Sequence, residues 1–93
     1  MTKDAISSAL SAEGLTASQD IFAIPEDREA IFFVAAPGDV MPVNKVTRVE
    51  LRDKVLCLNT VKDEHFWFTY DLILGLRALA AKPGKDRVAG FAK

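Results

Sequence analysis

Residues 45–70 hold three segments with the composition of β-strands, separated by two short polar turns. The segments are 45–51, 55–58 and 65–70, and the turns are at 52–53 and 62–63. Strands joined by such short turns run antiparallel, because a parallel connection needs a crossover of a dozen or more residues. The pattern therefore predicts a three-stranded meander, with apolar and polar side chains on alternate faces.

The chain before this meander predicts further strands. Residues 21–24 are apolar, and a Pro-led turn at 25–28 separates them from the continuous apolar run 30–34. A continuous run is typical of a strand that is covered on both faces. Pro37 and Gly38 predict a turn after it. Pro42 places the next segment at a sheet edge or in a connection, because proline has no N–H to donate.

A short helix is predicted over residues 3–13. Thr2 can cap its first turn, and Gly14 suits the left-handed position that follows a helix. Leu15 can then close the end of the helix by packing against Leu10.

A second helix is predicted over residues 71–82. Its apolar positions recur at helical spacing (Leu72, Ile73, Leu76, Leu79 and Ala80). Asp71 suits its N-cap, and Pro83 with Gly84 would end it. The competing interpretation continues the strand through this segment, with Leu74 between Leu72 and Leu76 on one face. Gly75 weakens both interpretations, since it disfavours a helix and often marks a bulge in a strand.

These elements predict an α+β fold in which about five antiparallel strands, as a curved sheet or open small barrel, are flanked by an N-terminal and a C-terminal helix. Residues 1–84 are expected to be one domain, and residues 85–93 a mobile basic tail. Docking of Val88 and Phe91 on the sheet is the alternative for that tail.

The net charge of −1 hides an asymmetry along the chain. Residues 1–39 carry seven acidic and two basic side chains, whereas residues 40–93 carry ten basic and six acidic ones. Such segregation favours association with a second copy or with another protein. One cysteine, no long apolar segment and no signal-peptide pattern indicate a cytoplasmic protein without a membrane partner.

The residue types needed for catalysis are scarce. A single histidine, His65, and a single cysteine, Cys57, make no zinc site. Cys57 lies between two leucines, where a free thiol behaves as a small hydrophobic residue. No phosphate-binding glycine motif is present. We therefore expect no enzyme activity, no metal, no cofactor and no small-molecule substrate.

The surplus of large apolar residues instead indicates a protein-interaction domain of the adaptor or regulatory kind, with a tendency to self-associate. Alternation along 65–70 places Trp67 and His65 on the face opposite Phe66 and Phe68. A tryptophan beside a polar rim is a favoured interface anchor. Phe33 and Leu74 are the further candidate contacts. Coverage of Trp67 by the N-terminal helix is the competing expectation.

Nucleic-acid binding by a small barrel is the alternative function. Lys45, Arg48, Arg52 and Lys54 lie near aromatic residues that could stack on bases. A pI of 5.7 and the absence of a recognised RNA-binding motif argue against it.

Overall fold

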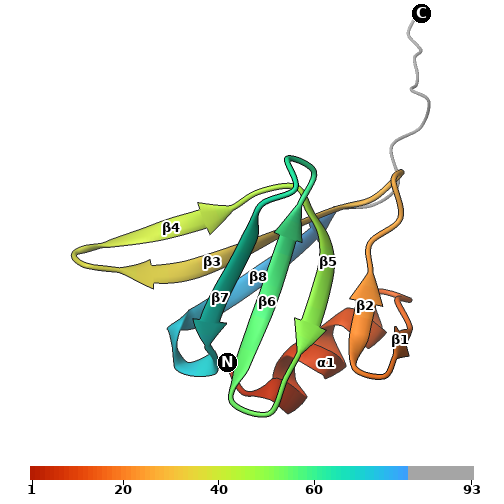
Figure 1. The fold of residues 1–93 in the computed structure, drawn as a ribbon, viewed down its shortest axis with the longest axis horizontal. Coiled ribbons are helices and arrows are strands. Elements are labelled where there is room, and N and C mark those ends of the chain that lie inside the picture. Colours follow the sequence, from red (N-terminus) through yellow and green to blue (C-terminus); the bar gives the residue numbers. More distant parts are fainter. Residues whose placement is uncertain (80–93) are drawn as a thin grey trace, which may run out of the picture.

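The computed structural model describes residues 1–79, which form two antiparallel sheets and one α-helix (Figure 1). The elements are α1 (Lys3–Ala12), β1 (Ala17–Ser18), β2 (Ile21–Ala23), β3 (Glu29–Ala36), β4 (Asp39–Val43), β5 (Val46–Leu51), β6 (Val55–Thr60), β7 (His65–Thr69), the 3-10 turn η1 (Tyr70–Leu72) and β8 (Ile73–Leu79). One sheet has the strand order β1-β2-β5-β6-β7, and the other β4-β3-β8. The expectations for residues 80–93, including the docking of Val88 and Phe91, lie outside the described residues.

The predicted N-terminal helix and both of its caps are confirmed. The Thr2 hydroxyl accepts a hydrogen bond from the Ala5 N–H at 3.0 Å. Gly14 follows the helix with φ +83°, and the Leu15 N–H donates to the Leu10 carbonyl at 3.1 Å. This backward bond satisfies a carbonyl that the helix leaves unpaired, and glycine allows it because a side chain would disfavour the left-handed conformation.

The predicted meander is also confirmed, as β5, β6 and β7 are consecutive antiparallel neighbours. Val49 and Leu51 point into the core, while Arg48 lies exposed on the other face. The alternation of side chains in the sequence therefore gives the correct inner and outer faces.

A small hairpin, β1–β2, extends this sheet beyond β5. Strand β2 lies within the predicted apolar run 21–24, whereas β1 and the turn between the two strands were not predicted. The two turn residues, Gln19 and Asp20, both have positive φ, at 55° and 63°. Hairpin turns of this kind usually reveal themselves by Asn-Gly or Asp-Gly. This one carries no glycine, so the sequence gives little signal for it.

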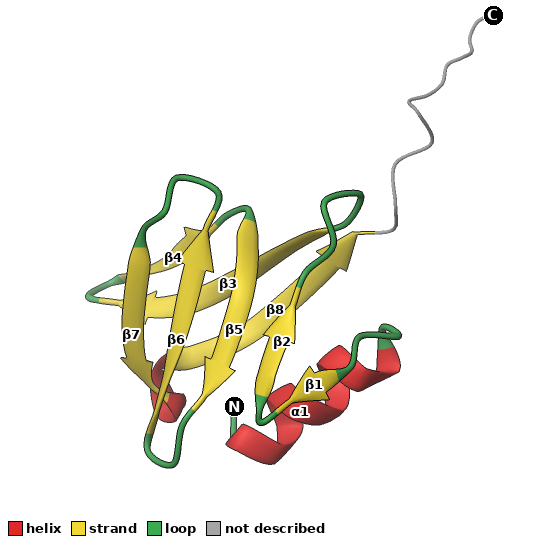
Figure 2. Cartoon of the chain, turned by 45° about the vertical axis from the view of Figure 1, so that its right-hand side comes forward, coloured by secondary structure: helices red, strands yellow, loops and turns green. Residues whose placement is uncertain are grey.

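The second sheet has β3 at its centre and two edge strands. The turn at Pro37 and Gly38 joins β3 to β4, with Gly38 at φ +69°. Pro42 lies on β4, and the expected edge position is confirmed. The hairpin formed by β3 and β4 projects beyond β7 (Figures 1 and 2).

The helix expected over 71–82 is wrong for its described part. A 3-10 turn occupies Tyr70–Leu72, and strand β8 follows and pairs with β3. The central strand β3 has backbone hydrogen-bonding groups along both of its edges, and β4 pairs with only one edge. Pairing of its other edge with β8 outweighs the helical spacing of the leucines, which is an intrinsically weak preference. The register shifts between Phe33 and Val34, so β8 contains a bulge next to Gly75. A bulge is what a glycine inside a strand often marks.

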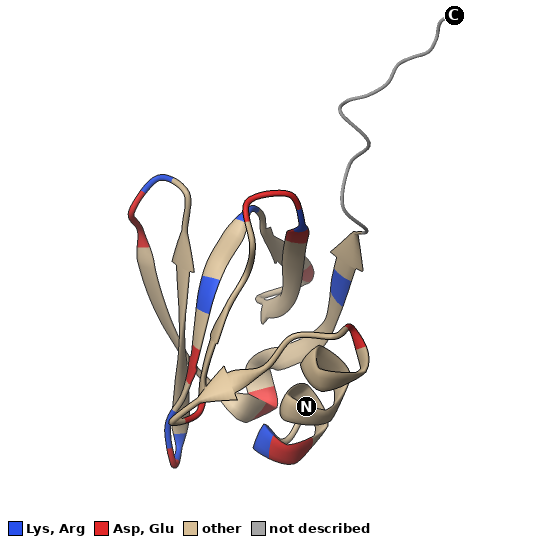
Figure 3. Ribbon diagram, turned by 90° about the vertical axis from the view of Figure 1, so that its right-hand side faces the viewer, with Lys and Arg blue, Asp and Glu red and all other residues tan. Residues whose placement is uncertain are grey.

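The core lies between the two sheets and α1, which is on the same side of the larger sheet as the smaller one (Figure 3). Its most buried large side chains are Ile6, Leu10, Phe22, Phe32, Val34, Val49, Leu56, Leu58 and Ile73. Phe66 and Phe68 pack against this cluster but are only half-buried. Burial of apolar area at roughly 25 cal/mol per Å² is the main stabilising contribution of such a core.

The fold is thus broadly α+β and mostly antiparallel, as expected, but with eight strands in two sheets where about five in one sheet were expected. Only one flanking helix is found among residues 1–79. None of the described helices has the length and apolar composition needed to cross a membrane.

Candidate functional site

The four residues expected to contact a partner fall on two separate surfaces. Trp67 and His65 lie on the outer face of the larger sheet, because Phe66 and Phe68 between and beside them face the core. Phe33 lies on the outer face of the smaller sheet, because its neighbours Phe32 and Val34 are buried. The two faces point in opposite directions, so the sequence candidates do not form one site.

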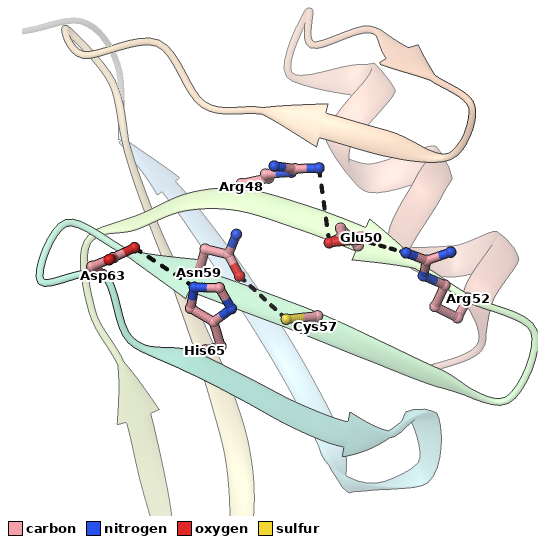
Figure 4. Close-up of polar contacts among 7 residues, drawn as sticks. All are labelled: Arg48, Glu50, Arg52, Cys57, Asn59, Asp63 and His65. Atoms are coloured by element: carbon pink, nitrogen blue, oxygen red, sulfur yellow. Dashed lines mark hydrogen bonds and ion pairs between the residues drawn. The ribbon is translucent and has the colours of Figure 1, made fainter.

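The first surface, here called the Trp67 surface, consists of the outward side chains of β5, β6 and β7: Arg48, Glu50, Cys57, Asn59, His65 and Trp67. Figure 4 shows its polar contacts, without Trp67. Trp67 is 54% exposed. Helix α1 lies on the other side of the sheet, so the expectation that it covers Trp67 is wrong (Figure 3).

Glu50 organises the charges of the Trp67 surface. Arg52 Nη2 lies 2.9 Å from one carboxylate oxygen of Glu50, and Arg48 Nη2 lies 3.9 Å from the other. The Glu50 side chain is 13% exposed, compared with 48% and 60% for the two arginines. The negative charge of Glu50 therefore offsets part of the positive charge of Arg48 and Arg52 on this surface.

Cys57 forms the floor of this surface. Its thiol donates to the Asn59 side-chain oxygen at 3.2 Å, and the residue is 1% exposed. Burial raises the pKa of the Cys57 thiol, and the nearby Glu50 carboxylate raises it further. Arg48 and Arg52 act in the opposite direction. Cys57 is thus held as a neutral thiol, which is a poor nucleophile.

His65 has one charged neighbour. Its Nε2 lies 3.6 Å from Asp63 Oδ1, and the Asp63 side chain is 97% exposed. Asp63 itself sits in the β6–β7 turn with φ 62°. Across residues 1–79, no group of three His, Cys, Asp or Glu side chains is arranged to hold a metal ion.

The second surface, here called the β3–β8 face, consists of Ile31, Phe33 and Ala35 on β3, Val40 and Pro42 on β4, and Leu74 on β8. Phe33 lies opposite Pro42 on one side and Gly75 on the other. Neither neighbour has a long side chain, and Phe33 itself is half-buried. Leu74 occupies the bulge and is 54% exposed, and Val40 is 46% exposed.

Few charges interrupt the β3–β8 face. Glu29 and Arg77 lie at one end, where Glu29 pairs in register with Leu79 and Arg77 pairs with Ile31. They are thus diagonal neighbours of opposite sign on one face of the sheet. The sequence pattern predicts Phe33 and Leu74 as contacts but gives no signal for Ile31 and Val40, whose place on this face depends on the pairing of β3 with both edge strands.

The basic residues of the nucleic-acid alternative do not form one patch. Lys45 precedes β5 and Lys54 follows it, so the strand Val46–Leu51 separates them by about 20 Å at 3.3 Å per residue. Arg48 and Arg52, which lie between the two lysines along the chain, both form ion pairs with Glu50.

The larger of the two described pockets lies elsewhere. It has a volume of about 540 Å³ and is lined by Ile24, Pro25, Glu26, Asp27, Arg28, Glu29, Lys45, Val46, Thr47 and Val61. The smaller pocket, of about 360 Å³, lies between the β4 hairpin and the β6–β7 turn and is lined by Met41, Pro42, Val43, Asn44, Lys45, Thr60, Val61, Lys62, Glu64 and Phe66. Neither pocket is predictable from the sequence pattern, because each joins segments that are distant along the chain.

Comparison of the chain with known protein families, curated proteins and solved structures found no match. What the molecule does is therefore inferred from its own residues.

Proposed function

We propose that this chain is a non-catalytic protein-interaction domain, of the adaptor or regulatory kind, that self-associates in the cytoplasm through the β3–β8 face. The observation that carries this proposal is the run of apolar side chains across all three strands of the smaller sheet, with Val40 and Leu74 46% and 54% exposed. Contiguous apolar surface of this kind on a small domain often marks an interaction site.

A second copy is the proposed partner because the β3–β8 face is suited to pairing with itself. A two-fold axis brings the same patch of both copies together. The apolar centre around Phe33 would then meet its own copy. Glu29 and Arg77 carry opposite charges at one end of the patch, so each can meet the other residue of the second copy. The patch is small, which favours a dissociation constant in about the micromolar range.

The non-catalytic part of the proposal is supported by the state of the reactive side chains. Cys57 is buried as a neutral thiol, and His65 contacts only the exposed Asp63 among the described charged groups. A nucleophile and a base within hydrogen-bond reach would be needed for covalent catalysis.

Nucleic-acid binding is the less supported alternative. Its candidate residues are spread along β5, and two of them are engaged by Glu50. Binding that weakens steeply as salt is raised would favour it nonetheless.

The deciding experiment is the molar mass in solution as a function of protein concentration. We expect a dimer at about 100 μM and a monomer at about 1 μM. Leu74→Glu should shift the equilibrium to the monomer, because it places two like charges in the apolar interface.

Trp67→Glu is the matched control, since Trp67 has the same exposed fraction of 54% as Leu74 but lies on the other sheet. It should leave the dimer intact. A monomer at every concentration contradicts self-association, and a dimer that is lost only in Trp67→Glu assigns the interface to the Trp67 surface.

A further inference from the structure

Strand β7 is the one edge of the larger sheet that has an appreciable length within residues 1–79. The opposite edge, β1, has only two residues. In the smaller sheet, β4 carries Pro42 on its edge, and β8 contains the bulge at Leu74. Short strands, prolines and bulges are the means by which proteins protect sheet edges from pairing with other chains. Strand β7 (His65–Thr69) has none of these.

The direction of the backbone groups on β7 follows from two backbone hydrogen bonds at the ends of β6. The Thr60 N–H donates to the Glu64 carbonyl at 3.0 Å, and the Arg52 N–H donates to the Val55 carbonyl at 2.9 Å. Hydrogen-bonded and non-hydrogen-bonded pairs alternate along antiparallel strands. Phe66 and Phe68 therefore exchange their bonds with β6. The N–H groups of His65, Trp67 and Thr69 point away from β6, toward the open edge.

Space for another strand exists beside this edge. The β3–β4 hairpin projects past β7 on the inner side of the sheet (Figures 1 and 2). Met41 pairs with Val34, so its side chain faces the same inner side, yet Met41 is 38% exposed and Val34 only 1%. The smaller pocket lies between Met41 on the hairpin and Phe66 on β7. The hairpin thus supplies a floor beside β7, with Met41 as its exposed apolar residue and with Lys62 and Glu64 among the polar residues that line the same pocket.

We propose that the free edge of β7 binds one extended segment of another protein, which pairs antiparallel with His65–Thr69 and covers the floor at Met41. Addition of a strand to a sheet edge uses main-chain hydrogen bonds for affinity and alternate side chains for specificity. The occupant is a single extended strand because the outward N–H groups of His65, Trp67 and Thr69 are spaced as the carbonyls of a neighbouring strand require.

The side chains on each face of β7 define the chemistry of that segment. Its inward side chains would lie beside Phe66 and Phe68, whose rings are stacked 6.2 Å apart, and so are apolar. Its outward side chains would lie beside His65 and Trp67 on the solvent-facing side of the sheet, where polar residues are favoured. Strand β6 has this pattern on the other side of β7, with Leu58 opposite Phe66 and Leu56 opposite Phe68.

The probe is a synthetic peptide with the sequence of residues 54–61 and serine in place of the cysteine. One version is N-methylated at its two leucines, which leaves free the amides that face β7. The other is N-methylated at its serine and asparagine, which blocks those amides.

Trp67 is the only tryptophan of the chain, so its fluorescence reports on occupancy of this edge. The leucine-methylated peptide should give a saturable emission change. The other version should bind about tenfold more weakly or worse, since several hydrogen bonds are lost.

The protein variants Thr69→Pro and Thr69→Ala give the reciprocal test. Thr69 has φ −76°, which proline adopts, and only its outward N–H is lost. Thr69→Pro should therefore keep the thermal midpoint near that of Thr69→Ala and lose about tenfold in peptide affinity relative to it. Equal binding of the two peptide versions, equal binding by the two variants, or no saturable change overturns the proposal.

This test is independent of the proposed self-association. The mass of the Thr69 variants should still respond to concentration, because the β3–β8 face is on the other sheet. A peptide-binding monomer would contradict the dimer alone, and a dimer without peptide binding would contradict the β7 site alone.

Discussion

Cys57 and Trp67 lie opposite each other on β6 and β7, on the outer face of the larger sheet, and yet one is 1% exposed and the other 54%. Their backbone groups point away from each other, so they form a non-hydrogen-bonded pair, in which side chains approach most closely. The indole on one side and Glu50 on the other are the cross-strand neighbours of the thiol. A residue on a solvent-facing side of a sheet is thus buried by its neighbours alone.

Trp67→Ala is therefore expected to expose the Cys57 thiol. Labelling by a disulfide reagent at pH 8 should be slow in the natural chain and become about tenfold faster or more in the variant, because access limits the rate at a buried thiol. His65→Ala is the control. His65 is on the same face but lies opposite Asn59, so its removal should leave the rate nearly unchanged. Equal acceleration by both variants would indicate general loosening of β7.

Stability should fall as the pH rises above about 9. Burial raises the pKa of Cys57 in the folded state above its ordinary value of 9.0, and Glu50 adds to the rise. The unfolded chain then loses its proton first, so the folded state is favoured fully below pH 9 and progressively less as the pH approaches the folded pKa. Tyr70 behaves in the same way from its ordinary value of 10.0, mainly through burial.

The measurement is the denaturant midpoint between pH 7 and pH 10.5 for the natural chain and for Cys57→Ala. The variant should show a shallower decline between pH 9 and 10, because it lacks the thiol that starts to titrate there in the natural chain. A decline of identical steepness in both proteins would show that Cys57 ionises equally in the folded and unfolded states.

Arg28 joins three parts of the chain that the sequence does not connect. Its Nη1 and Nη2 donate to the Glu13 carbonyl at 2.6 Å and to Glu13 Oε1 at 2.8 Å, and its Nε donates to the Leu79 carbonyl at 3.3 Å. The end of α1 and the end of β8 are thereby fixed to the turn before β3. Sequence analysis placed Arg28 only in a turn, since its partners are remote.

Arg28→Ala should lower the free energy of unfolding by about 1–3 kcal/mol, as hydrogen bonds from a charged donor to backbone carbonyls are lost. Glu13→Gln is the control. It keeps the carbonyl contact and removes only the charge of a side chain that is 43% exposed, so less than about 1 kcal/mol is expected. Chemical denaturation of both variants tests this. Similar losses would mean that the ion pair, and not the backbone contacts, stabilises this junction.

The elements predicted correctly are those with local physical signals. The caps at Thr2 and Gly14, the turn at Gly38 and the edge position of Pro42 follow from hydrogen bonding and permitted φ values within a few residues. The exposed position of Trp67 follows from strand alternation in the same way.

The errors concern features that depend on distant partners. Residues 73–79 carry helical spacing, but Asp71, the expected N-cap, lies inside the single turn η1, whose N-cap is Thr69. These residues form a strand because they pair with the edge of β3 that β4 leaves open, about 40 residues earlier in the chain. The division of the candidate residues between two faces depends on the same pairing. For that reason Leu74 could be proposed as a contact but not placed beside Phe33.

The last prediction separates core from surface among the aromatic residues. Phe32 is 0% exposed at the centre of the smaller sheet, Phe66 is half-buried against the core, and Trp67 is 54% exposed. Phe32→Ala should cost about 3–5 kcal/mol, enough to unfold a domain of this size, because it leaves a cavity that rigid strands cannot close. Phe66→Ala should cost less, about 1–3 kcal/mol, in keeping with its partial burial. Trp67→Ala should cost less than about 1 kcal/mol.

The order of the three denaturant midpoints tests this ranking, and Phe32→Leu is the matched control, because it retains most of the apolar volume and should remain folded. If Trp67→Ala lowers the midpoint as much as Phe66→Ala, then the indole contributes to folding through its cover over Cys57. The labelling rate of Cys57 would rise in parallel with that loss. If the midpoint holds while binding of a fluorescently labelled peptide at β7 is lost, Trp67 serves recognition and not stability; the label is on the peptide because this variant lacks the only tryptophan.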